Sequence, residues 1–318
     1  TTSIFVPITD AAVKDAWKML PSRNLLHPAT GRPVYVPSNE MSLGLYRATA
    51  INEKSTHEFK TPEEVLAAVA QGKVRWETVK IGGKPTTVGR VRIWASMPDD
   101  MRTDAMLFDN KQVWNAKVTN SFLKELAEKK PQEYANTVQK ITDLGSRNVF
   151  EDAFSLSVND FQADKKTREK VLGEARKEAS KVLSDHSLTR KQKDEKVIDV
   201  WAEAGDRMEK EHWATNPTGG LAQMTLAGVK PSRDQYKQLM LAPMLMAGTK
   251  GKIIPSPVAR SYSEGLDTAG FWVQSMAARR TMFQKTQEVR EPGYLTKQVA
   301  NTTADMVAEA HQRNYLVH

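Results

Sequence analysis

A 36-residue segment near the carboxyl end, residues 264–299, most constrains how this chain can fold. Its apolar residues recur at helical spacing, so the segment predicts one long helix. On an ideal helix with about 100° per residue, Arg279, Arg290 and Lys297 lie within about 20° of one another. A cationic stripe would therefore run along about 27 Å of one face. This pattern favours contact with a polyanion.

The rest of this predicted helix is rich in large apolar side chains. We expect them to form the face opposite the cations and to require burial against other protein. Pro292-Gly293 removes a backbone donor and a Cβ, so a kink or hinge is expected there. A core helix with a solvated charged face is the alternative interpretation of the same pattern. The apolar set consists of Leu266, Phe271, Trp272, Val273, Met276 and Phe283.

Composition excludes several classes of protein. The net formal charge of +8 suits contact with nucleic acid, although many basic proteins bind none. The absence of cysteine excludes disulfides and thiolate zinc sites. None of the six histidines has another at i+3 or i+4, which argues against a histidine metal site. Without a run of about 18 apolar residues or a signal-like amino terminus, the pattern predicts a soluble, unexported protein with no membrane partner.

Local patterns in the first half predict helices and one β-hairpin. Thr9-Asp10 begins a helix, and Thr61-Pro62-Glu63-Glu64 has the form of a capping box. Alternating residues on both sides of Gly82-Gly83 predict a hairpin over about 74–97. The other expected elements are a strand at 3–6, a loop at 21–39 and helices at 42–50, 111–128 and 132–143.

Three residues of the expected second hairpin strand, Arg90, Arg92 and Trp94, would share one strand face. Such a face could contact nucleic acid or could be solvated or covered by another subunit. The sequence leaves these interpretations open.

A charged region after Asn159 contains two apolar series with coiled-coil spacing. The series are joined by turn residues at 184–189, so the two helices should fold back on each other as an antiparallel arm. A thin apolar seam with charge all round predicts a coil that projects into solvent. The first series is Leu172, Ala175, Ala179 and Val182, and the second is Val197, Trp201, Ala204 and Met208.

Within residues 264–299, the groups Glu264-Gly265-Leu266, Ala278-Arg279-Arg280 and Gly293-Tyr294-Leu295-Thr296-Lys297 share a characteristic spacing. It resembles, without a gap, the bridge helix of the largest catalytic subunit (β′) of bacterial-type multisubunit RNA polymerases. Other blocks are similar to β′ segments in the same order, including an F-loop-like stretch and the rim arm of the secondary channel. These blocks are residues 24–46, 86–90, 144–160, 196–207 and 232–257.

The sequence departs from this family at the metal site. In β′ subunits the magnesium-binding carboxylates lie in an NADFDGD motif, which this sequence lacks. The adjacent pair Asp99-Asp100 reads as an ordinary turn. The resemblance therefore implies that Mg²⁺ of the assembled active centre is held by a companion polypeptide, and that this chain binds no cofactor itself. Giant bacteriophages carry β′ split over several polypeptides, and this is the closest resemblance; a truncated longer subunit is the competing explanation.

The resemblance also implies roles for individual residues. Lys230 and Arg233 would lie near the incoming nucleoside triphosphate, and a set on the bridge helix would contact the template or the RNA–DNA hybrid. Long cations suit this task because they reach phosphates without reading bases. The bulky pair Val289-Arg290 stands where the family commonly has small residues, which alters the expected contact with the template base. The bridge-helix set is Arg279, Arg280, Lys285, Thr286, Val289, Arg290, Gly293, Tyr294, Thr296 and Lys297.

The sequence thus predicts a mainly α fold with a small β component, elongated, with a coiled-coil arm and a long bridge helix. The expected segments are 1–157, the arm at 158–213, an F-loop-like region at 214–263, and the bridge helix with an extension at 264–318. The implied function is a split β′ subunit of a DNA-directed RNA polymerase, inactive alone and partnered by other subunits, template DNA and product RNA. It would act in the infected bacterial cell or be packaged in the virion. The alternative is a non-catalytic helical protein that binds nucleic acid or a polymerase.

Overall fold

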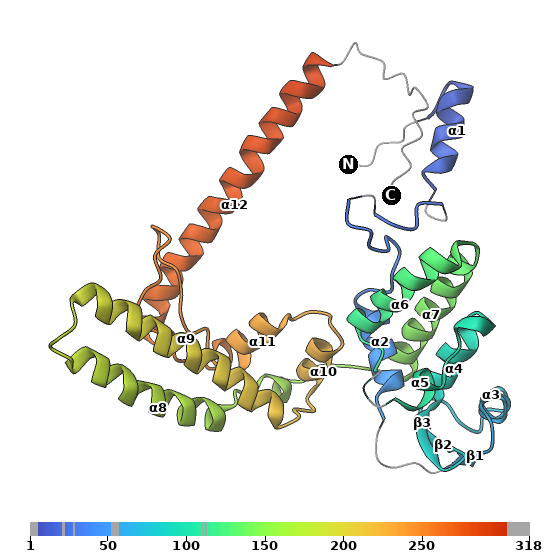
Figure 1. Cartoon of the computed structure of the whole chain (residues 1–318), viewed down its shortest axis with the longest axis horizontal. Coiled ribbons are helices and arrows are strands. Elements are labelled where there is room, and N and C mark those ends of the chain that lie inside the picture. The colour runs from blue at the N-terminus through green and yellow to red at the C-terminus, as the bar shows by residue number, and fades with distance from the viewer. Residues whose placement is uncertain are drawn as a thin grey trace. The chain divides into compact units, whose positions relative to one another are not determined.

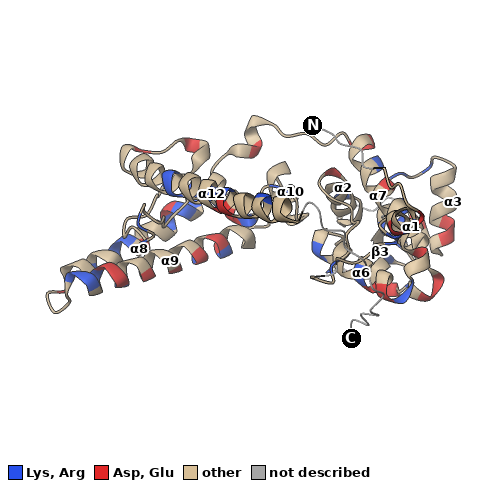
Figure 2. Ribbon diagram, turned by 90° about the horizontal axis from the view of Figure 1, so that it is seen from above, with Lys and Arg blue, Asp and Glu red and all other residues tan. Residues whose placement is uncertain are grey.

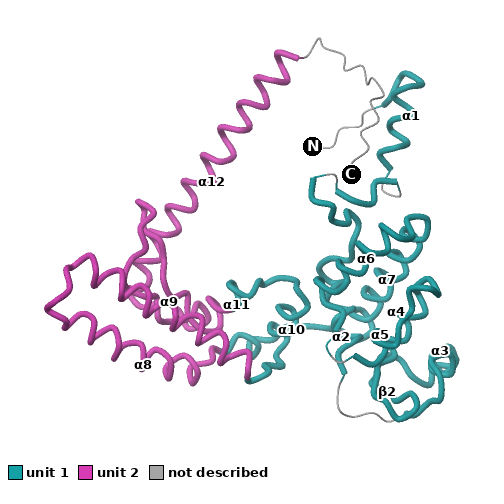
Figure 3. Tube along the Cα trace, in the orientation of Figure 1, with its two compact units in different colours: residues 1–162, 215–236 teal, residues 163–214, 237–318 magenta. Residues whose placement is uncertain are grey.

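The computed structural model describes most of the chain, which forms two compact units (Figure 3). Unit 1 comprises residues 1–162 and 215–236, and unit 2 comprises residues 163–214 and 237–318. The mainly helical fold with a small sheet is confirmed. The division into four segments stays a prediction. The described residues are 6–20, 23–27, 29–51, 57–109, 111 and 113–303.

Unit 1 begins with helix α1 (Asp10–Lys18), as predicted. The side chain of Thr9 accepts the amide hydrogen bond of Ala12 at 3.2 Å, which caps the helix. None of the residues of α1 is buried. The strand expected at 3–6 falls, except for Val6, outside the described residues.

The core of unit 1 is built on α2 (Glu40–Thr49), α6 (Ala116–Lys129) and α7 (Pro131–Glu151) (Figure 1). α2 and α7 approach so closely that a Cβ on Gly44 would lie 1.9 Å from the carbonyl oxygen of Gly145. Only glycine permits this backbone contact. All three helices are confirmed, and α7 continues well beyond its expected end at 143. Fully buried side chains around them include Leu45, Trp114, Leu123, Leu126 and Ile141.

A three-stranded sheet packs at one end of unit 1, in the order β1 (Glu58–Phe59), β2 (Thr78–Ile81), β3 (Lys84–Thr87). β2 and β3 form the expected hairpin, because Gly82 and Gly83 adopt the positive φ angles that a tight turn needs. β1 pairs with β2 in parallel. α3 (Pro62–Ala70) follows β1 and begins with the predicted cap, Thr61.

The second hairpin strand is much shorter than predicted, because residues 88–96 form helix α4 (Val88–Ser96). The side chain of Thr87 accepts the amide hydrogen bond of Arg90 and starts this helix. β-Branched residues that suggest a strand, such as Val88 and Val91, instead pack at helical spacing into the core. The prediction that Arg90, Arg92 and Trp94 share a strand face is therefore wrong.

Arg90 is 1% exposed and serves the structure of unit 1. It donates hydrogen bonds to the carbonyl oxygens of Thr49 at 2.8 Å and Asp109 at 2.9 Å. Burial lowers the pKa of this guanidinium. Arg92 lies over the ring of Trp76, with 4.3 Å from its Cζ to the ring centroid. The remaining short elements of unit 1 are η1 (Asp99–Met101), α5 (Asp104–Phe108), η2 (Val158–Phe161) and α10 (Gly220–Leu226).

Unit 2 contains the antiparallel arm that the apolar spacing predicts. α8 (Lys165–Ser184) and α9 (Arg190–Ala214) run side by side, and lysine, arginine and acidic residues alternate along them (Figures 1 and 2). Their shared seam is narrow, with Trp201 7% exposed and Met208 fully buried. The arm is therefore confirmed, with its turn between Ser184 and Arg190.

The base of the arm carries the remaining elements of unit 2. α11 (Arg233–Met240) leads from unit 1 into a ribbon at 244–258, in which Met244 pairs with Val258 and Ala247 with Ile253. The turn η3 (Tyr262–Glu264) follows, and then α12 (Thr268–Thr302) extends for 35 residues. α12 continues through Pro292 without a break. Among the described helices, none is both long and apolar enough to cross a membrane.

Candidate nucleic-acid interface

Unit 2 buries α12 mainly at its first two turns, and the ribbon tip approaches it again at Arg280. Asp267 caps it by accepting the amide hydrogen bond of Gly270 at 2.7 Å. Gly270 packs so closely on Val258 of the ribbon that an added Cβ would lie 3.3 Å from that side chain. Gly270 and Val273 are the only buried residues of α12. Residues 274–277 are half-buried, and from Ala278 onward nearly every residue of the helix is exposed.

A buried ion pair fixes the segment just before α12 to the arm. Arg168 of α8, whose side chain is 4% exposed, binds both carboxylate oxygens of Glu264, with 3.3 Å between Nη2 and Oε1. Ser261 donates to the same carboxylate at 2.8 Å, and Lys165 lies 3.3 Å from it. The hydrogen bonds from Arg168 lower the pKa of Glu264 to about 2. Arg168 also donates to the carbonyl oxygen of Leu241 at 3.4 Å.

The cationic stripe predicted on this helix lies on a surface that the described chain leaves open. Arg279, Arg290 and Lys297 are all exposed. Their common direction on the helix and their span of about 27 Å follow from the regular helical geometry. The stripe is continuous because Thr286 and Gly293 lie within about 40° of the same line.

The prediction that all the apolar residues lie opposite this stripe is wrong. By the helical repeat, Trp272 and Phe283 lie about 20° and 40° from Arg279 and share its face. Both rings are exposed, at 68% and 67%. Cations and aromatic rings therefore alternate on one surface, a combination that suits binding of nucleic-acid strands because phosphates meet the cations and bases stack on the rings.

The cations of this surface have no ion-pair partner in the part of the chain that the structure describes. In the described ranges, neither Arg279, Arg290 nor Lys297 forms an ion pair or a side-chain hydrogen bond. α12 carries five cations and two carboxylates, so its net charge is positive. Charges that remain unpaired on a fixed helix attract anionic ligands over several ångströms.

The other predicted residues of α12 flank the stripe. Arg280 lies about 100° to one side, while Lys285, Val289 and Thr296 lie about 80–120° to the other side. The exposed ring of Tyr294 is about 60° from Arg279.

The two threonine hydroxyls of the predicted bridge-helix set are engaged within α12. Thr286 donates to the carbonyl oxygen of Met282 and Thr296 to that of Pro292, both at 2.8 Å. Each hydroxyl can still accept a hydrogen bond from a ligand.

The two residues predicted to approach a nucleotide belong to unit 1. Lys230 is exposed before Pro231, and Arg233 is exposed at the first residue of α11. The grouping of these two residues with α12 in one site stays a prediction.

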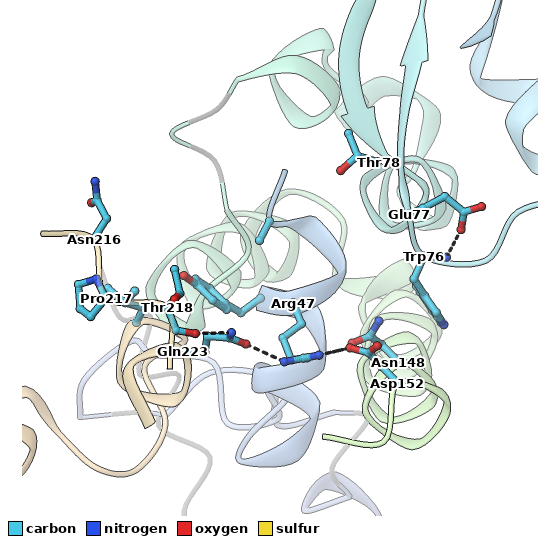
Figure 4. Close-up of a pocket in the computed structure, with 13 residues that line it drawn as sticks. Arg47, Trp76, Glu77, Thr78, Asn148, Asp152, Asn216, Pro217, Thr218 and Gln223 are labelled. Atoms are coloured by element: carbon cyan, nitrogen blue, oxygen red, sulfur yellow. Dashed lines mark hydrogen bonds and ion pairs between the residues drawn. The ribbon is translucent and has the colours of Figure 1, made fainter. Parts of the chain in front are cut away.

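A polar cavity of about 550 Å³ in unit 1 was not predicted (Figure 4). Arg47 crosses it and donates to Gln223 at 2.6 Å and, through Nε, to Asp152 at 3.0 Å, so its charge is already matched. Asn148 lines the cavity with a buried Oδ1 that has no hydrogen-bond partner. The lining includes no histidine or cysteine. Its residues come from distant parts of the sequence, and no local motif marks them.

The chemistry available on the described surface is electrostatic positioning. Across the described residues, no group of three or more histidine, cysteine, aspartate or glutamate side chains could hold a metal ion. Asp99 and Asp100 are engaged by Arg102 and Lys130, at 2.8 Å each. These carboxylates do not converge as ligands of Mg²⁺ must. These two carboxylates therefore do not form a magnesium site with other described residues.

The chain is similar, almost end to end, to bacterial RNA polymerase β′ subunits. It is 28% identical over 335 residues to the DNA-directed RNA polymerase subunit β′ of Sulfurihydrogenibium sp. (strain YO3AOP1), covering 96% of this chain and 21% of that one. The corresponding subunit of Treponema pallidum is 27% identical over 333 residues, with 96% of this chain and 23% of the relative covered.

A third β′ subunit, from Caldanaerobacter subterraneus subsp. tengcongensis, is 27% identical over 338 residues and 28% of its length is covered. No protein-family model matches the chain. This β′-like chain thus spans 21–28% of the length of these three relatives. The resemblance inferred from the motifs is supported at the level of the β′ subunit.

Proposed function

We propose that this β′-like chain works in a multisubunit DNA-directed RNA polymerase and that α12 is its bridge helix. The observation that carries the proposal is a cationic stripe that forms no ion pair with the described residues, on a helix in which those residues bury only Gly270 and Val273. A helix of 35 residues with exposed apolar side chains gains most of its stability from packing. We infer that companion subunits cover the apolar side chains and that nucleic acid covers the stripe.

In this proposal the chain positions the polynucleotide and performs no chemical step by itself. Arg279, Arg290 and Lys297 would each hold a separate backbone phosphate and so fix the register of the template strand. Tyr294 would offer a ring for stacking. Lys230 would meet the triphosphate of the incoming nucleotide as a single point charge.

We further propose that the carboxylates for Mg²⁺ come from a companion polypeptide, as in the split β′ subunits of giant bacteriophages. Two magnesium ions would stabilise the attacking and leaving oxygens of an in-line displacement in the assembled enzyme. The NADFDGD motif does not occur within residues 1–318. A companion reading frame with that motif in the same genome would be expected, and a single long β′ gene that includes this sequence would contradict the split form.

Reconstitution tests the function directly. The full chain should make no RNA alone, and co-expression with its companion subunits should restore Mg²⁺-dependent synthesis on a primed template. The double variant Arg290→Ala/Lys297→Ala should slow elongation at least about tenfold, because two phosphate contacts are lost.

The matched control is Lys177→Ala/Lys181→Ala, which removes two exposed cations from α8. Equal elongation by both double variants would contradict the bridge-helix role. Nucleic-acid binding without any synthesis in the complete assembly would instead favour a non-catalytic binding protein.

A further inference from the structure

A hollow of about 560 Å³ lies between the tip of the 244–258 ribbon and α12. Lys250 and Gly251 line it from the ribbon, and Arg279, Arg280 and Phe283 line it from the helix. All of these residues belong to unit 2. The hollow is therefore a feature of one compact unit.

The ribbon tip is shaped to approach α12 closely. The amide of Gly251 donates to the carbonyl oxygen of Gly248, and that of Gly248 donates to Lys252, both at 2.9 Å. Gly251 has a φ of +81°, a conformation that side chains other than glycine rarely adopt. A Cβ at this position would lie 3.4 Å from Nη2 of Arg280. The turn thus sets the guanidinium of Arg280 against the ribbon.

The hollow concentrates positive charge without a neutralising group. Lys250, Arg279 and Arg280 contribute three cations, and no carboxylate lines the hollow. None of the three forms an ion pair within the described ranges. Like charges held together repel one another, and an anion between them removes that repulsion. Phosphate oxygens match guanidinium groups especially well because they accept two parallel hydrogen bonds.

The aromatic ring at the edge of the hollow indicates which phosphate source fits. Phe283 is 67% exposed and lies on the same helix face as Arg279. A free nucleotide or inorganic phosphate would need only the cations, whereas an unpaired strand also offers bases that stack on an open ring. In a duplex the base faces are already stacked on one another, so the ring would find no partner.

We propose that this hollow binds the backbone phosphates of single-stranded nucleic acid, with Phe283 stacking on a neighbouring base. The inference rests on the proposed function and adds Lys250 and the ribbon tip to the interface. Lys250 is the residue that sequence reasoning missed. Its place between two glycines in Gly248-Thr249-Lys250-Gly251 is the signal for an exposed lysine on a tight turn.

The test is fluorescence anisotropy of the full chain with a labelled single-stranded oligonucleotide of about 12 nucleotides. Lys250→Ala should weaken binding several-fold and reduce the slope of log K against log salt by about 0.7, the value for one phosphate contact on a single strand. Lys252→Ala is the matched control, because Lys252 is an exposed lysine in the same turn that does not line the hollow. It should change the slope much less.

Phe283→Ala separates strand binding from simple anion binding. It should weaken binding of the single strand by at least about fivefold and leave binding of a duplex of the same sequence unchanged, because only unpaired bases stack on the ring. Inorganic tripolyphosphate should compete with the oligonucleotide equally well for the wild type and Phe283→Ala, but less well for Lys250→Ala.

Equal effects of Lys250→Ala and Lys252→Ala would overturn the inference, as would loss of tripolyphosphate competition in Phe283→Ala. Circular dichroism of each variant identifies any misfolded protein, and Lys250→Arg should retain binding. These outcomes are distinct from failure of the proposed function, which is decided by RNA synthesis in the reconstituted assembly.

Discussion

Glu264→Gln tests the junction between α8 and the start of α12. The substitution preserves the shape of the side chain but removes the charge that Arg168 and Lys165 bind. The pKa of Glu264 falls from an ordinary 4.5 to about 2, mainly because of the hydrogen bonds from Arg168. At about 1.4 kcal/mol per pH unit, this difference corresponds to about 3 kcal/mol of stability at neutral pH.

The pH dependence of the stabilisation by Glu264 follows from the direction in which its pKa is shifted. Because the pKa of Glu264 is lower in the folded than in the unfolded chain, its contribution is complete above about pH 4.5 and disappears as the pH falls toward about 2. The free energy of unfolding of the wild type should therefore exceed that of Glu264→Gln by about 3 kcal/mol at pH 7. This difference in stability should disappear as the pH falls from about 4.5 to about 2.

Urea unfolding at several pH values measures the difference, and hydrogen exchange of peptides from α8 and residues 261–273 assigns it to the junction. Glu178→Gln is the matched control, since Glu178 is an exposed carboxylate of α8 without an ion pair in the described part of the chain. If Glu264→Gln and Glu178→Gln gave the same stability and the same acid profile, the junction would contribute nothing and the reasoning would be refuted.

Three further substitutions, with Gly173→Ala of unit 2 as a control, test the packing of unit 1. Gly44→Ala should lower the free energy of unfolding, measured in urea, by at least about 3 kcal/mol because its Cβ would overlap a backbone carbonyl. Gly173 faces open space on α8, so Gly173→Ala should raise the free energy of unfolding by about 1 kcal/mol. Arg90→Met should cost about 3 kcal/mol by leaving buried carbonyl oxygens unpaired, measured in the same way. Burial raises the pKa of Tyr134 to about 12. The contribution of Tyr134 to the free energy of unfolding should therefore be complete below about pH 10 and lost as the pH rises toward 12. Ultraviolet titration of the wild type against Tyr134→Phe checks this pKa.

Elements that depend on local signals were predictable from the sequence. Thr9 and Thr61 mark helix starts by their own side-chain hydrogen bonds, which need no tertiary context. The arm was predictable because its two apolar series repeat at coiled-coil spacing on either side of a turn. Leu241, Ala242 and Met244 join the same buried cluster, and this spacing does not mark them. The cationic stripe followed from helical geometry once the helix itself was predicted.

Features that depend on tertiary context were not predictable in the same way. α4 is rich in β-branched residues, and burial of Val88 and Val91 in the core outweighs their preference for strands. The cavity around Arg47 joins α2, α7 and α10, and the hollow beside Phe283 joins a ribbon turn to α12. Both sites depend on how separate elements pack, which no single stretch of sequence records.

The shallow anchoring of α12 gives it the properties of a lever. Its last buried residue is Val273, and Thr302 lies 29 residues further along, or about 44 Å at the rise of an α-helix. A rotation of about 5° at the anchored end would move the distant end by about 4 Å, on the order of the spacing between neighbouring nucleotides. Small adjustments of the arm base could thus be amplified into a displacement as large as one step along a polynucleotide.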